Sequence, residues 1–324
     1  MLKILFVSSG NSKNFDIAPF IKSQGNSLIK AGVDVVFFPL CGKGFSGYLK
    51  SAYRLRKFLK KNIVHIIHAH YTLSGWSAVL AFPKQPIILS LMGTDAYGEY
   101  KGINKIKLTS RYLILLTYLI QPFVNAIICK SKHIESSVFL KKKSSVIPNG
   151  IMLDKISYSE NDFKGELGLN PDKKHILFLG SKKSKRKNYK LLAAAMDLIK
   201  SDDISVVAPY PIPHDQVIKY LNSVDVLVVP SLMEGSPNVV KEAMACNCPV
   251  VATGVGDVAW LFGDKPGYYL TGFQPEDVAG KLSLALQYAY QNGKTNGRQR
   301  IIELGLDADS IAKRLISVYQ SVVQ

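Results

Sequence analysis

The chain has 324 residues, of which 47% are hydrophobic and 20% are charged. This balance is typical of globular proteins and excludes disordered, collagen-like and coiled-coil classes, and the length accommodates two domains with a core in each. Lys and Arg outnumber Asp and Glu by 41 to 24, which gives a formal net charge of +17. An anionic partner is therefore expected, and nucleic acid, phosphorylated small molecules and anionic lipid all remain open.

The cysteines and the N-terminus indicate a cytoplasmic protein. Cys41, Cys129, Cys246 and Cys248 form no Cys-x-x-Cys pair and no tight disulfide framework, so a reducing compartment is predicted. The first apolar run, within residues 1–10, is too short for the core of a signal peptide and is shaped like a buried first strand. No export is implied.

In chain order, the first half alternates between short apolar, β-branched runs and helical segments. Such alternation builds a parallel sheet covered by helices. The predicted strands are residues 3–9, 33–40, 63–70, 86–93, 125–131 and 144–150, and the clearest helical segments are residues 20–32 and 46–62.

One stretch in this half, residues 112–129, nearly reaches the length of a membrane-spanning helix. Gln121, Pro122 and Asn125 divide it into a helical part and a short strand-like part. A buried helix followed by a buried strand is therefore predicted in place of a membrane span.

The second half repeats the arrangement, which predicts an α/β fold with two Rossmann-like domains, residues 1–155 and 156–324. A Pro-Asn-Gly turn at 148–150 marks the approach to the boundary. Ligands of such sheets bind beyond the carboxyl ends of the strands, so the loops of both domains are expected to meet at a shared cleft. The predicted strands are 175–181, 203–209, 224–231 and 249–254, and the predicted helices are 187–200, 214–223, 237–247 and 307–323. The final helix could pack on either domain, including the first.

The segment after the strand at 224–231 carries the most specific motif. Glu234 and Glu242 are separated by seven residues, and Ser236, followed by proline, is a good helix N-cap. Glu234 would lie in the loop and Glu242 on the second helical turn, so the two carboxylates could accept hydrogen bonds from two different hydroxylated groups. Between them, the amides of Gly235, Ser236 and Asn238 offer a seat for phosphate. This is the pattern of a nucleotide sugar, and a capped surface helix with two solvated glutamates is the alternative.

The surrounding sequence, PSLMEGSPNVVKEAMACNCPVVAT, resembles the donor-binding segment of family-4 glycosyltransferases, which have the GT-B fold. The resemblance extends over essentially the whole chain. It implies a retaining transferase with two parallel sheets facing a central cleft, a nucleoside-diphosphate sugar as donor, a glycan or lipid-linked acceptor in surface polysaccharide or glycoconjugate synthesis, no cofactor and no metal-binding Asp-x-Asp. The other similar stretches are HAHY at 68–71, SLMGTD at 90–95, CKS at 129–131, VIPNG at 146–150, FLGSKKSKRKN at 178–188 and PVVATGVGD at 249–257.

Position by position, the resemblance assigns roles to three charged residues. Glu242 matches the carboxylate on the nucleotide ribose, Glu234 the one facing the transferred sugar, and Lys187 the basic residue on the diphosphate. The family commonly has Arg directly after the glycine of its first C-terminal strand, whereas here Gly180 is followed by Ser181.

The charge of that absent Arg is expected to come from Arg186, with help from Lys182, and which of the two supplies it stays open. Breaking the sugar–phosphate bond builds negative charge on the departing diphosphate, and fixed cations and a helix start would stabilise it without a metal. A solvated basic loop is the alternative for this Lys-rich segment.

Three histidines lie within residues 65–70 and could suggest a metal site. On a strand, His68 and His70 share one face while His65 points the opposite way, so at most two could meet one ion, and no metal is expected. His70 matches the family's active-site histidine, which lies beside the donor sugar and phosphate. A packed or hydrogen-bonded structural histidine is the alternative.

Polar residues after the first and fourth strands are further candidates. Ser9, Gly10 and Asn11 offer flexible backbone and exposed amides for close approach of phosphate or acceptor, or they form an ordinary turn. Thr94 and Asp95 face the same expected cleft, where Asp95 could bind an acceptor hydroxyl or cap the next helix.

Two other patterns have simpler explanations. Residues 254–259 satisfy G-x-G-x-x-A, with Glu276 and Asp277 at a plausible distance for a ribose contact, but a dinucleotide site there would lack a complete domain around it. Asp307 and Asp309 resemble an Asp-x-Asp metal pair, but they open the final helix and are interpreted as capping residues.

Residues 49–61 combine basic side chains with apolar ones. Such a helix can lie on an anionic bilayer at the inner face of the cell membrane, close to a lipid-linked acceptor, or it can pack on the sheet with a solvated basic face.

Two rival functions are a nucleotide-sugar epimerase of the same architecture and a nucleic-acid-binding protein. Nucleic acid is not expected as a partner, because the basic residues are scattered and the paired carboxylates would repel a phosphate backbone.

Overall fold

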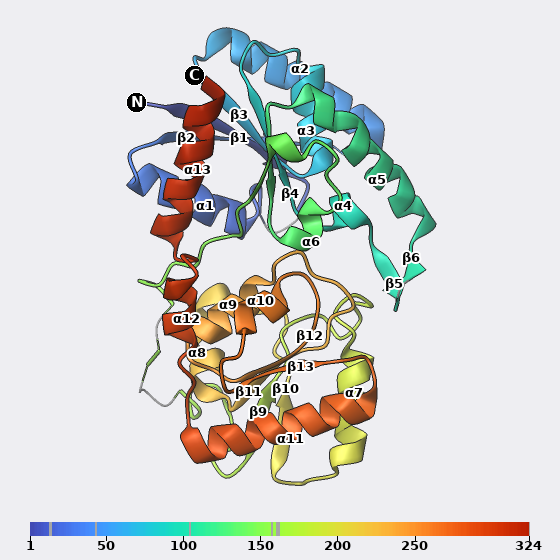
Figure 1. Ribbon diagram of the computed structural model, residues 1–324, viewed down its shortest axis with the longest axis vertical. Helices are drawn as coiled ribbons and strands as arrows, with labels where there is room; N and C mark the ends of the chain where they lie inside the picture. The colour runs from blue at the N-terminus through green and yellow to red at the C-terminus, as the bar shows by residue number, and fades with distance from the viewer. Residues whose placement is uncertain (13–14, 43, 104, 157, 160–162, 324) are drawn as a thin grey trace. The chain divides into compact units, whose positions relative to one another are not determined.

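The structure is a computed structural model that describes residues 1–12, 15–42, 44–103, 105–156, 158–159 and 163–323. It divides into two compact units, each with its own sheet and helices (Figure 1). The first unit contains Met1–Gly98, Lys107–Gly150 and Ala308–Gln324, and the second contains Glu99–Ile106 and Ile151–Asp307. The main boundary therefore follows Gly150, where the sequence placed it after residue 155, and the final helix belongs to the first unit. The prediction of one continuous first domain is wrong for Glu99–Ile106, which belongs to the second unit.

Within the described residues, the first unit contains a six-stranded parallel sheet with the order β2-β1-β3-β4-β7-β8. Each strand lies inside one of the apolar runs from which a strand was predicted. The central strands β3, β4 and β7 are buried along their whole length, as expected for a parallel sheet covered on both faces. The strands are β1 (Lys3–Ser9), β2 (Asp34–Leu40), β3 (Ile66–His70), β4 (Ile87–Leu91), β7 (Ala126–Cys129) and β8 (Ser144–Val146).

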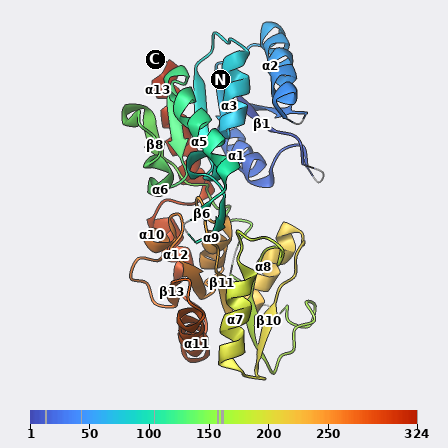
Figure 2. The same ribbon diagram turned by 90° about the vertical axis from the view of Figure 1, so that its right-hand side faces the viewer.

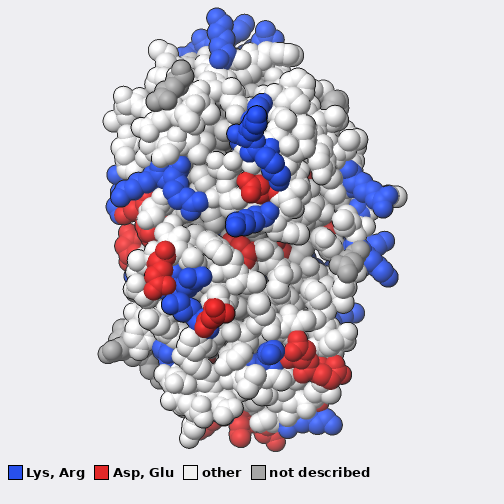
Figure 3. Space-filling view, in the orientation of Figure 1, with Lys and Arg blue, Asp and Glu red and all other residues white. Residues whose placement is uncertain are grey.

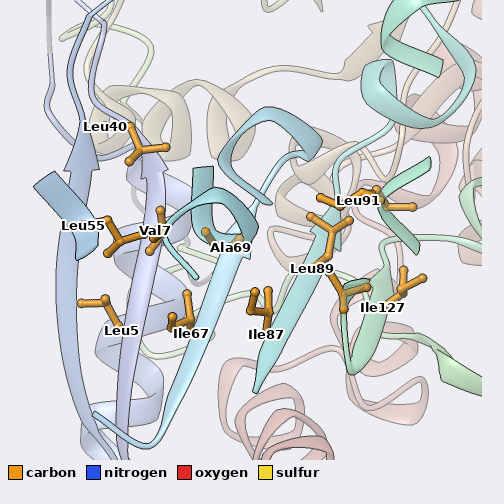
Figure 4. Close-up of a cluster of buried hydrophobic side chains, with 14 of the residues drawn as sticks. Leu5, Val7, Leu40, Leu55, Ile67, Ala69, Ile87, Leu89, Leu91 and Ile127 are labelled. Atoms are coloured by element: carbon orange, nitrogen blue, oxygen red, sulfur yellow. The ribbon is translucent and has the colours of Figure 1, made fainter. Parts of the chain in front are cut away.

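Helices cover the two faces of this sheet. Leu5, Val7 and Ile67 pack on one face with residues of α2, α3 and α5 (Figure 4). On the opposite face, Tyr319 of α13 contacts His68, and α1 packs against β2. The helical elements are α1 (Pro19–Lys30), α2 (Gly44–Lys61), α3 (Thr72–Leu80), α4 (Thr94–Tyr97), α5 (Leu108–Ile120), α6 (Lys132–Glu135), α13 (Ala308–Val323) and the short 3-10 turns η1 (Gln121–Phe123) and η2 (Lys141–Lys143).

The stretch at 112–129 divides near Gln121 and Pro122, as predicted, and its strand β7 is buried. The prediction that its helix is buried is wrong, because α5 lies on the surface and exposes several large apolar side chains. Apolar composition alone does not show which face of a helix meets the core. No helix within the described part of the chain is both long and apolar enough to cross a bilayer.

The second unit is built on a five-stranded parallel sheet, as far as the structure describes it, with the order β10-β9-β11-β12-β13. Its strands are β9 (Lys174–Leu177), β10 (Ile204–Val207), β11 (Val226–Val229), β12 (Val250–Thr253) and β13 (Tyr268–Thr271), and a separate antiparallel pair is formed by β5 (Tyr100–Gly102) and β6 (Lys105–Ile106).

Two helices of the second unit, α7 and α11, lie side by side and close one face of its core (Figure 2). Leu192 of α7 and Leu282 of α11 are fully buried there against Ile176 and Val228 of the sheet. The sequence predicted β9–β12 and α7–α9 but not β13 or α11. The helices are α7 (Tyr189–Ile199), α8 (His214–Ser223), α9 (Asn238–Ala245), α10 (Val258–Phe262), α11 (Pro275–Asn292) and α12 (Gly297–Glu303).

Candidate active site

The loops that follow β9, β11 and β12 meet at one edge of the second unit. These strands are neighbours in a parallel sheet, so their carboxyl ends and the loops after them lie together. The Leu232 amide donates to the Arg186 carbonyl at 2.8 Å, which joins the loops after β11 and β9. The Thr253 hydroxyl at the end of β12 donates to the Ser231 carbonyl at 2.6 Å. The motif residues from three separate segments are thereby brought into one place.

Glu234 lies at the centre of this edge, between two cations. Arg186 Nη1 is 2.6 Å from Glu234 Oε2, Lys187 Nζ is 2.7 Å from Glu234 Oε1, and the Ser231 hydroxyl donates to Oε1 at 3.0 Å. Burial alone would raise the pKa of Glu234, but Lys187 and Arg186 outweigh it and hold the pKa below its ordinary value. The carboxylate is ionised at neutral pH, and the cluster carries one positive charge in excess.

Local packing selects Arg186 rather than Lys182 for this cluster. Lys182 Nζ lies 4.8 Å from the ring centroid of Tyr189, whereas Arg186 contacts the Glu234 carboxylate. A Cβ at Gly180 would come within 3.0 Å of the Lys187 side chain, so the glycine allows Lys187 to pass close to the backbone. Of the two candidates for the charge of the absent Arg, Arg186 is the one that joins Lys187 at the motif.

Glu242 lies on the second turn of α9, as its spacing from Glu234 predicted. Its carboxylate Oε1 is 3.0 Å from Nε2 of His214, the first residue of α8. The hydrogen bond to Glu242 raises the pKa of His214 above its ordinary value, with burial acting in the opposite sense. Sequence reasoning did not select His214, although its position at the start of a predicted helix after the loop beyond β10 was a usable signal.

The expected N-cap role of Ser236 is wrong. α9 begins at Asn238, with Pro237 in the cap position and no side-chain cap hydrogen bond. The Ser236 hydroxyl instead donates to Asp257 Oδ2 at 2.6 Å, because the loop after β12 lies directly against the loop that carries Ser236. Ser236 therefore links the loop after β11 to the loop after β12. The start of α9 still contains Gly235, Ser236 and Asn238.

Lys241 completes this link and was not predicted from the sequence. Its side chain is fully buried, and its Nζ donates to the Ser236 hydroxyl at 3.2 Å. Burial lowers the pKa of Lys241 to about 8, against the opposing effect of Asp257 and Glu242, and burial raises the pKa of Asp257. A sequence signal existed, because Lys241 lies beside the helix positions of Val240 and Met244, whose apolar spacing marks a buried face.

The glycine-rich pattern at 254–259 has a structural explanation at this same point. Gly256 has φ +63°, and a Cβ there would approach the carbonyl oxygens of Glu234 and Gly235 to 2.8 Å. Glycine is required for that close approach between the loops. Asp277 accepts hydrogen bonds from the Gly272 amide and the Thr271 hydroxyl at the start of α11. The pattern therefore serves the contact with the Glu234 loop.

In the first unit, His70 is buried at the carboxyl end of β3. Its ring stacks on that of His68 with centroids 4.3 Å apart, and neither ring nitrogen has a hydrogen-bond partner among the described residues. Burial, followed by His68 and Lys130, holds the pKa of His70 well below its ordinary value, so the imidazole is neutral. The two histidines share one face of the strand, as predicted, while His65 Nδ1 accepts a hydrogen bond from the Lys3 amide.

His68 is fixed from both sides. The Tyr319 hydroxyl of α13 lies 2.8 Å from its Nδ1, and the Ser90 hydroxyl of β4 lies 2.7 Å from its Nε2. Burial is the main cause that lowers the pKa of His68 well below its ordinary value. The ring against which His70 stacks is therefore held by the final helix of the chain.

The loop after β1 is tied to the loop after β2. The Gly10 amide donates to the Leu40 carbonyl at 2.9 Å, and a Cβ at Gly10 would come within 2.7 Å of Pro39. The Asn11 side chain exchanges two hydrogen bonds of 2.8 Å with the backbone of Gly42. Ser9 ends β1 and is exposed, and its hydroxyl accepts from the Asn11 amide at 3.4 Å.

The candidates after β4 are also placed by internal hydrogen bonds. Asp95 is fully buried and accepts from the amides of Met92 and Gly93 at 2.9 Å and of Thr72 at 3.1 Å. Burial raises the pKa of this carboxyl despite those bonds. The Thr94 hydroxyl lies 3.4 Å from that of Tyr71. Asp95 does not cap α4, whose N-cap is Gly93 with no side-chain cap hydrogen bond; its buried carboxylate instead closes the turn between β4 and α4.

Comparisons with known proteins agree with this arrangement. Residues 13–155 match the family described as Glycosyltransferase Family 4, and residues 201–288 match Glycosyl transferases group 1. The chain is 31% identical over 261 residues to an uncharacterized glycosyltransferase of Methanocaldococcus jannaschii, which covers 74% of this chain and 71% of that protein. It is 25% identical over 291 residues to TuaC of Bacillus subtilis (strain 168), whose name connects it with teichuronic acid biosynthesis, and this match covers 80% of this chain and 71% of TuaC.

Solved structures show the same fold at lower sequence identity. Sucrose-phosphate synthase from Thermosynechococcus elongatus superposes with a TM-score of 0.78 at 19% identity and covers 99% of both chains. HepE of Anabaena in complex with UDP-glucose gives a TM-score of 0.75 at 15% identity and covers 99% of this chain and 100% of that one. The chain therefore belongs to the family-4 glycosyltransferases, and its two α/β units have the GT-B fold.

Proposed function

We propose that the protein is a retaining glycosyltransferase that moves a sugar from a nucleoside-diphosphate sugar to a glycan or lipid-linked acceptor in surface polysaccharide or glycoconjugate synthesis. The observation that carries the proposal is the cluster of Glu234, Arg186 and Lys187. Glu234 lies in the loop just before α9, and Glu242 lies on that helix. HepE was crystallised with UDP-glucose, and the name of TuaC connects that relative with a polysaccharide.

In this proposal the second unit binds the donor. Arg186 and Lys187 contact the diphosphate, and the backbone of Gly235, Ser236 and Asn238 lies at the start of α9, where the helix dipole favours an anion. Negative charge grows on the diphosphate as the sugar–phosphate bond breaks, and cations already fixed by Glu234 stabilise it with little reorganisation. Because the chain supplies this charge itself, the reaction is proposed to need no metal and no other cofactor.

The two carboxylates bind hydroxyl groups on either side of the diphosphate. Glu242 accepts hydrogen bonds from the ribose, and Glu234 faces the transferred sugar. In the ligand-free chain Glu242 is bonded to His214, so the ribose either shares this carboxylate with the imidazole or displaces it. Exchange of one hydrogen-bonded partner for another gives a modest net gain in affinity, which suits a substrate that must leave as product.

The first unit is proposed to face the acceptor. His70 remains the active-site candidate of this unit, with a neutral imidazole whose buried ring nitrogens have no hydrogen-bond partner within the described residues. Ser9, Asn11 and Thr94 remain acceptor-side candidates of this proposal. Attack on the same face as the departing phosphate, with that phosphate as the base, would give retention without a covalent intermediate.

The test begins with thermal shift in the presence of UDP, GDP, ADP, CMP and NAD, with and without magnesium, because a ligand of the folded state raises the apparent stability. Stabilisation by one nucleoside diphosphate without magnesium is expected. The matching sugar nucleotide is then supplied with an acceptor, and NMR reads the anomeric configuration of the product. A product that keeps the nucleotide would indicate an epimerase. Inversion of the anomeric configuration would contradict the retaining mechanism. Tight, salt-sensitive binding of oligonucleotides in place of nucleotides would indicate a nucleic-acid-binding protein.

A further inference from the structure

A ridge of exposed apolar side chains runs along the outer face of α5 and into η1. The exposed fractions are 74% for Leu108, 64% for Tyr112, 52% for Leu115, 51% for Leu119 and 58% for Phe123. Their spacings of four, three, four and four residues place all five on one face of a helix. We refer to these five residues as the α5 ridge.

Packing of the first unit does not account for the ridge. α5 is held to the unit by its other face, where Thr117 and Ile120 are buried and the Leu116 carbonyl accepts a hydrogen bond from Trp76 Nε1 at 3.0 Å. Phe123 packs on Trp76, with ring centroids 5.9 Å apart, but each of the five ridge side chains leaves half or more of its surface in water. Surfaces of this kind mark interaction sites in soluble proteins.

The three-helix layer that contains α5 also carries a cationic helix, α2. α3 contacts both α2 and α5, and it lies between them in the two views (Figures 1 and 2). None of these three helices contains Asp or Glu. Their exposed basic residues gather mainly over α2, at the top of Figure 3. These residues are Lys50, Arg54, Arg56, Lys57, Lys60 and Lys61 on α2 and Arg111 on α5.

Exposed aromatic side chains lie among these cations. The Arg56 guanidinium is 5.9 Å from the ring centroid of Phe82, which is 72% exposed, and Lys57 Nζ is 4.6 Å from that of Tyr53. An apolar strip next to basic and aromatic side chains is the composition with which proteins contact the boundary between lipid headgroups and acyl chains.

We propose that the face formed by α2, α3 and α5 binds the surface of an anionic lipid bilayer, with the α5 ridge entering the headgroup region and the basic side chains of α2 contacting lipid phosphates. The sequence had suggested bilayer contact for the basic helix alone. The α5 ridge supplies the apolar component that such a helix needs for stable attachment. A lipid surface fits this face better than a second copy of the chain, because seven cations without a carboxylate on the same helices repel an identical face. The proposal rests on this surface and not on the proposed reaction.

The test is cosedimentation of the full chain with vesicles of phosphatidylcholine alone or mixed with phosphatidylglycerol, at low and high salt. Binding is expected only to the anionic vesicles and is expected to weaken as salt rises. The double variant Leu115→Gln and Leu119→Gln should lower the partition coefficient by about 10-fold or more, since each leucine loses its transfer into the lipid interface. The variant Lys50→Gln and Lys60→Gln should lower it by a similar factor at low salt and by less at high salt.

Matched controls come from the second unit. Leu198 and Leu284 are 51% and 46% exposed, which is close to the values for Leu115 and Leu119, so Leu198→Gln with Leu284→Gln makes the same chemical change elsewhere. Lys173→Gln with Lys190→Gln, two exposed lysines, controls for net charge. The controls should bind vesicles like the unmodified chain. Equal vesicle binding by the Leu115/Leu119 variant and its control would overturn the proposal. It would also be overturned if the unmodified chain did not bind vesicles but formed a dimer, and the Leu115/Leu119 variant abolished that dimer.

Discussion

Replacement of the buried Lys241 tests how the Glu234 loop is held. The ammonium lies 3.2 Å from the Ser236 hydroxyl, which in turn donates to Asp257 at 2.6 Å. In the variant Lys241→Met the Asp257 carboxylate keeps its hydrogen bond from Ser236 but loses the nearby ammonium that opposes the effect of burial on its pKa. Breaking a buried pair from one side costs about 3–5 kcal/mol, because a charge is left without compensation. We expect a loss of about 3 kcal/mol in the free energy of unfolding.

The double variant Lys241→Met with Asp257→Asn separates pairing from packing. Each single variant leaves one buried ionisable group without its partner, whereas the double variant removes both charges. The double variant should therefore be more stable than either single one, with a coupling energy of about 2 kcal/mol or more. Urea unfolding at pH 7 measures all four proteins. Additive losses would refute the reasoning, because they would mean that Lys241 and Asp257 contribute independently.

The same lysine predicts a pH dependence whose sign can be worked out. Burial lowers the pKa of Lys241 from 10.5 to about 8, so between these values the unfolded chain binds a proton that the folded chain does not. The free energy of unfolding should then rise with pH in this window, by about 2 kcal/mol from pH 7 to pH 9.5. Other groups also titrate there, so the quantity to compare is the difference between the unmodified chain and Lys241→Met. A difference that does not change with pH would contradict the burial argument.

The remaining predictions concern the proposed donor site. Glu242→Gln should weaken nucleoside-diphosphate binding about 10-fold or more by calorimetry, because a charged acceptor for the ribose is lost; unchanged affinity would contradict its role. Lys187→Ala and Arg186→Ala should each lower kcat about 100-fold with little change in Tm, whereas Lys182→Ala should have a small effect; a large effect of Lys182→Ala alone would transfer the phosphate role to Lys182. The affinity for a sugar nucleotide should rise as pH increases through the raised pKa of His214, because deprotonation loosens its bond to Glu242. In His214→Gln that pH dependence should disappear, and an affinity that falls with increasing pH would instead mean that the imidazolium binds the donor.

The sheets could be predicted from the sequence because parallel strands buried on both faces are continuous apolar runs between turn residues. β13 lacks this signature, since Tyr269 and Leu270 are partly or largely exposed at the edge of the sheet. α5 illustrates the opposite difficulty. Its sequence is apolar on nearly every face, which favours burial, yet only one face meets the core. Composition measures how much apolar surface a helix has, but the partner of that surface is decided by tertiary packing.

The candidate site was predictable where it depends on strand order and was missed where it depends on burial. Arg186 and Glu234 are 48 residues apart, and both follow adjacent parallel strands, so topology alone brings them to one edge. Val240 and Met244 indicate a buried helix face beside Lys241, but only the folded structure shows that the lysine itself is fully buried and bonded to Ser236. His214 could not be paired with Glu242 before the helices α8 and α9 were seen to pack together.

The proposed donor site is already internally paired in the ligand-free chain, and this pairing determines how a donor would bind there. Glu234 is paired with Arg186 and Lys187, and Glu242 is hydrogen-bonded to His214. A diphosphate therefore does not meet bare cations, and a ribose does not meet a bare carboxylate, so binding exchanges existing contacts for new ones. The net gain is smaller than the sum of the new contacts, because each exchange also gives up a contact of the ligand-free chain. The same ion pairs keep the cations in position before substrate arrives. The arrangement therefore binds the substrate weakly in its ground state and stabilises the departing diphosphate well.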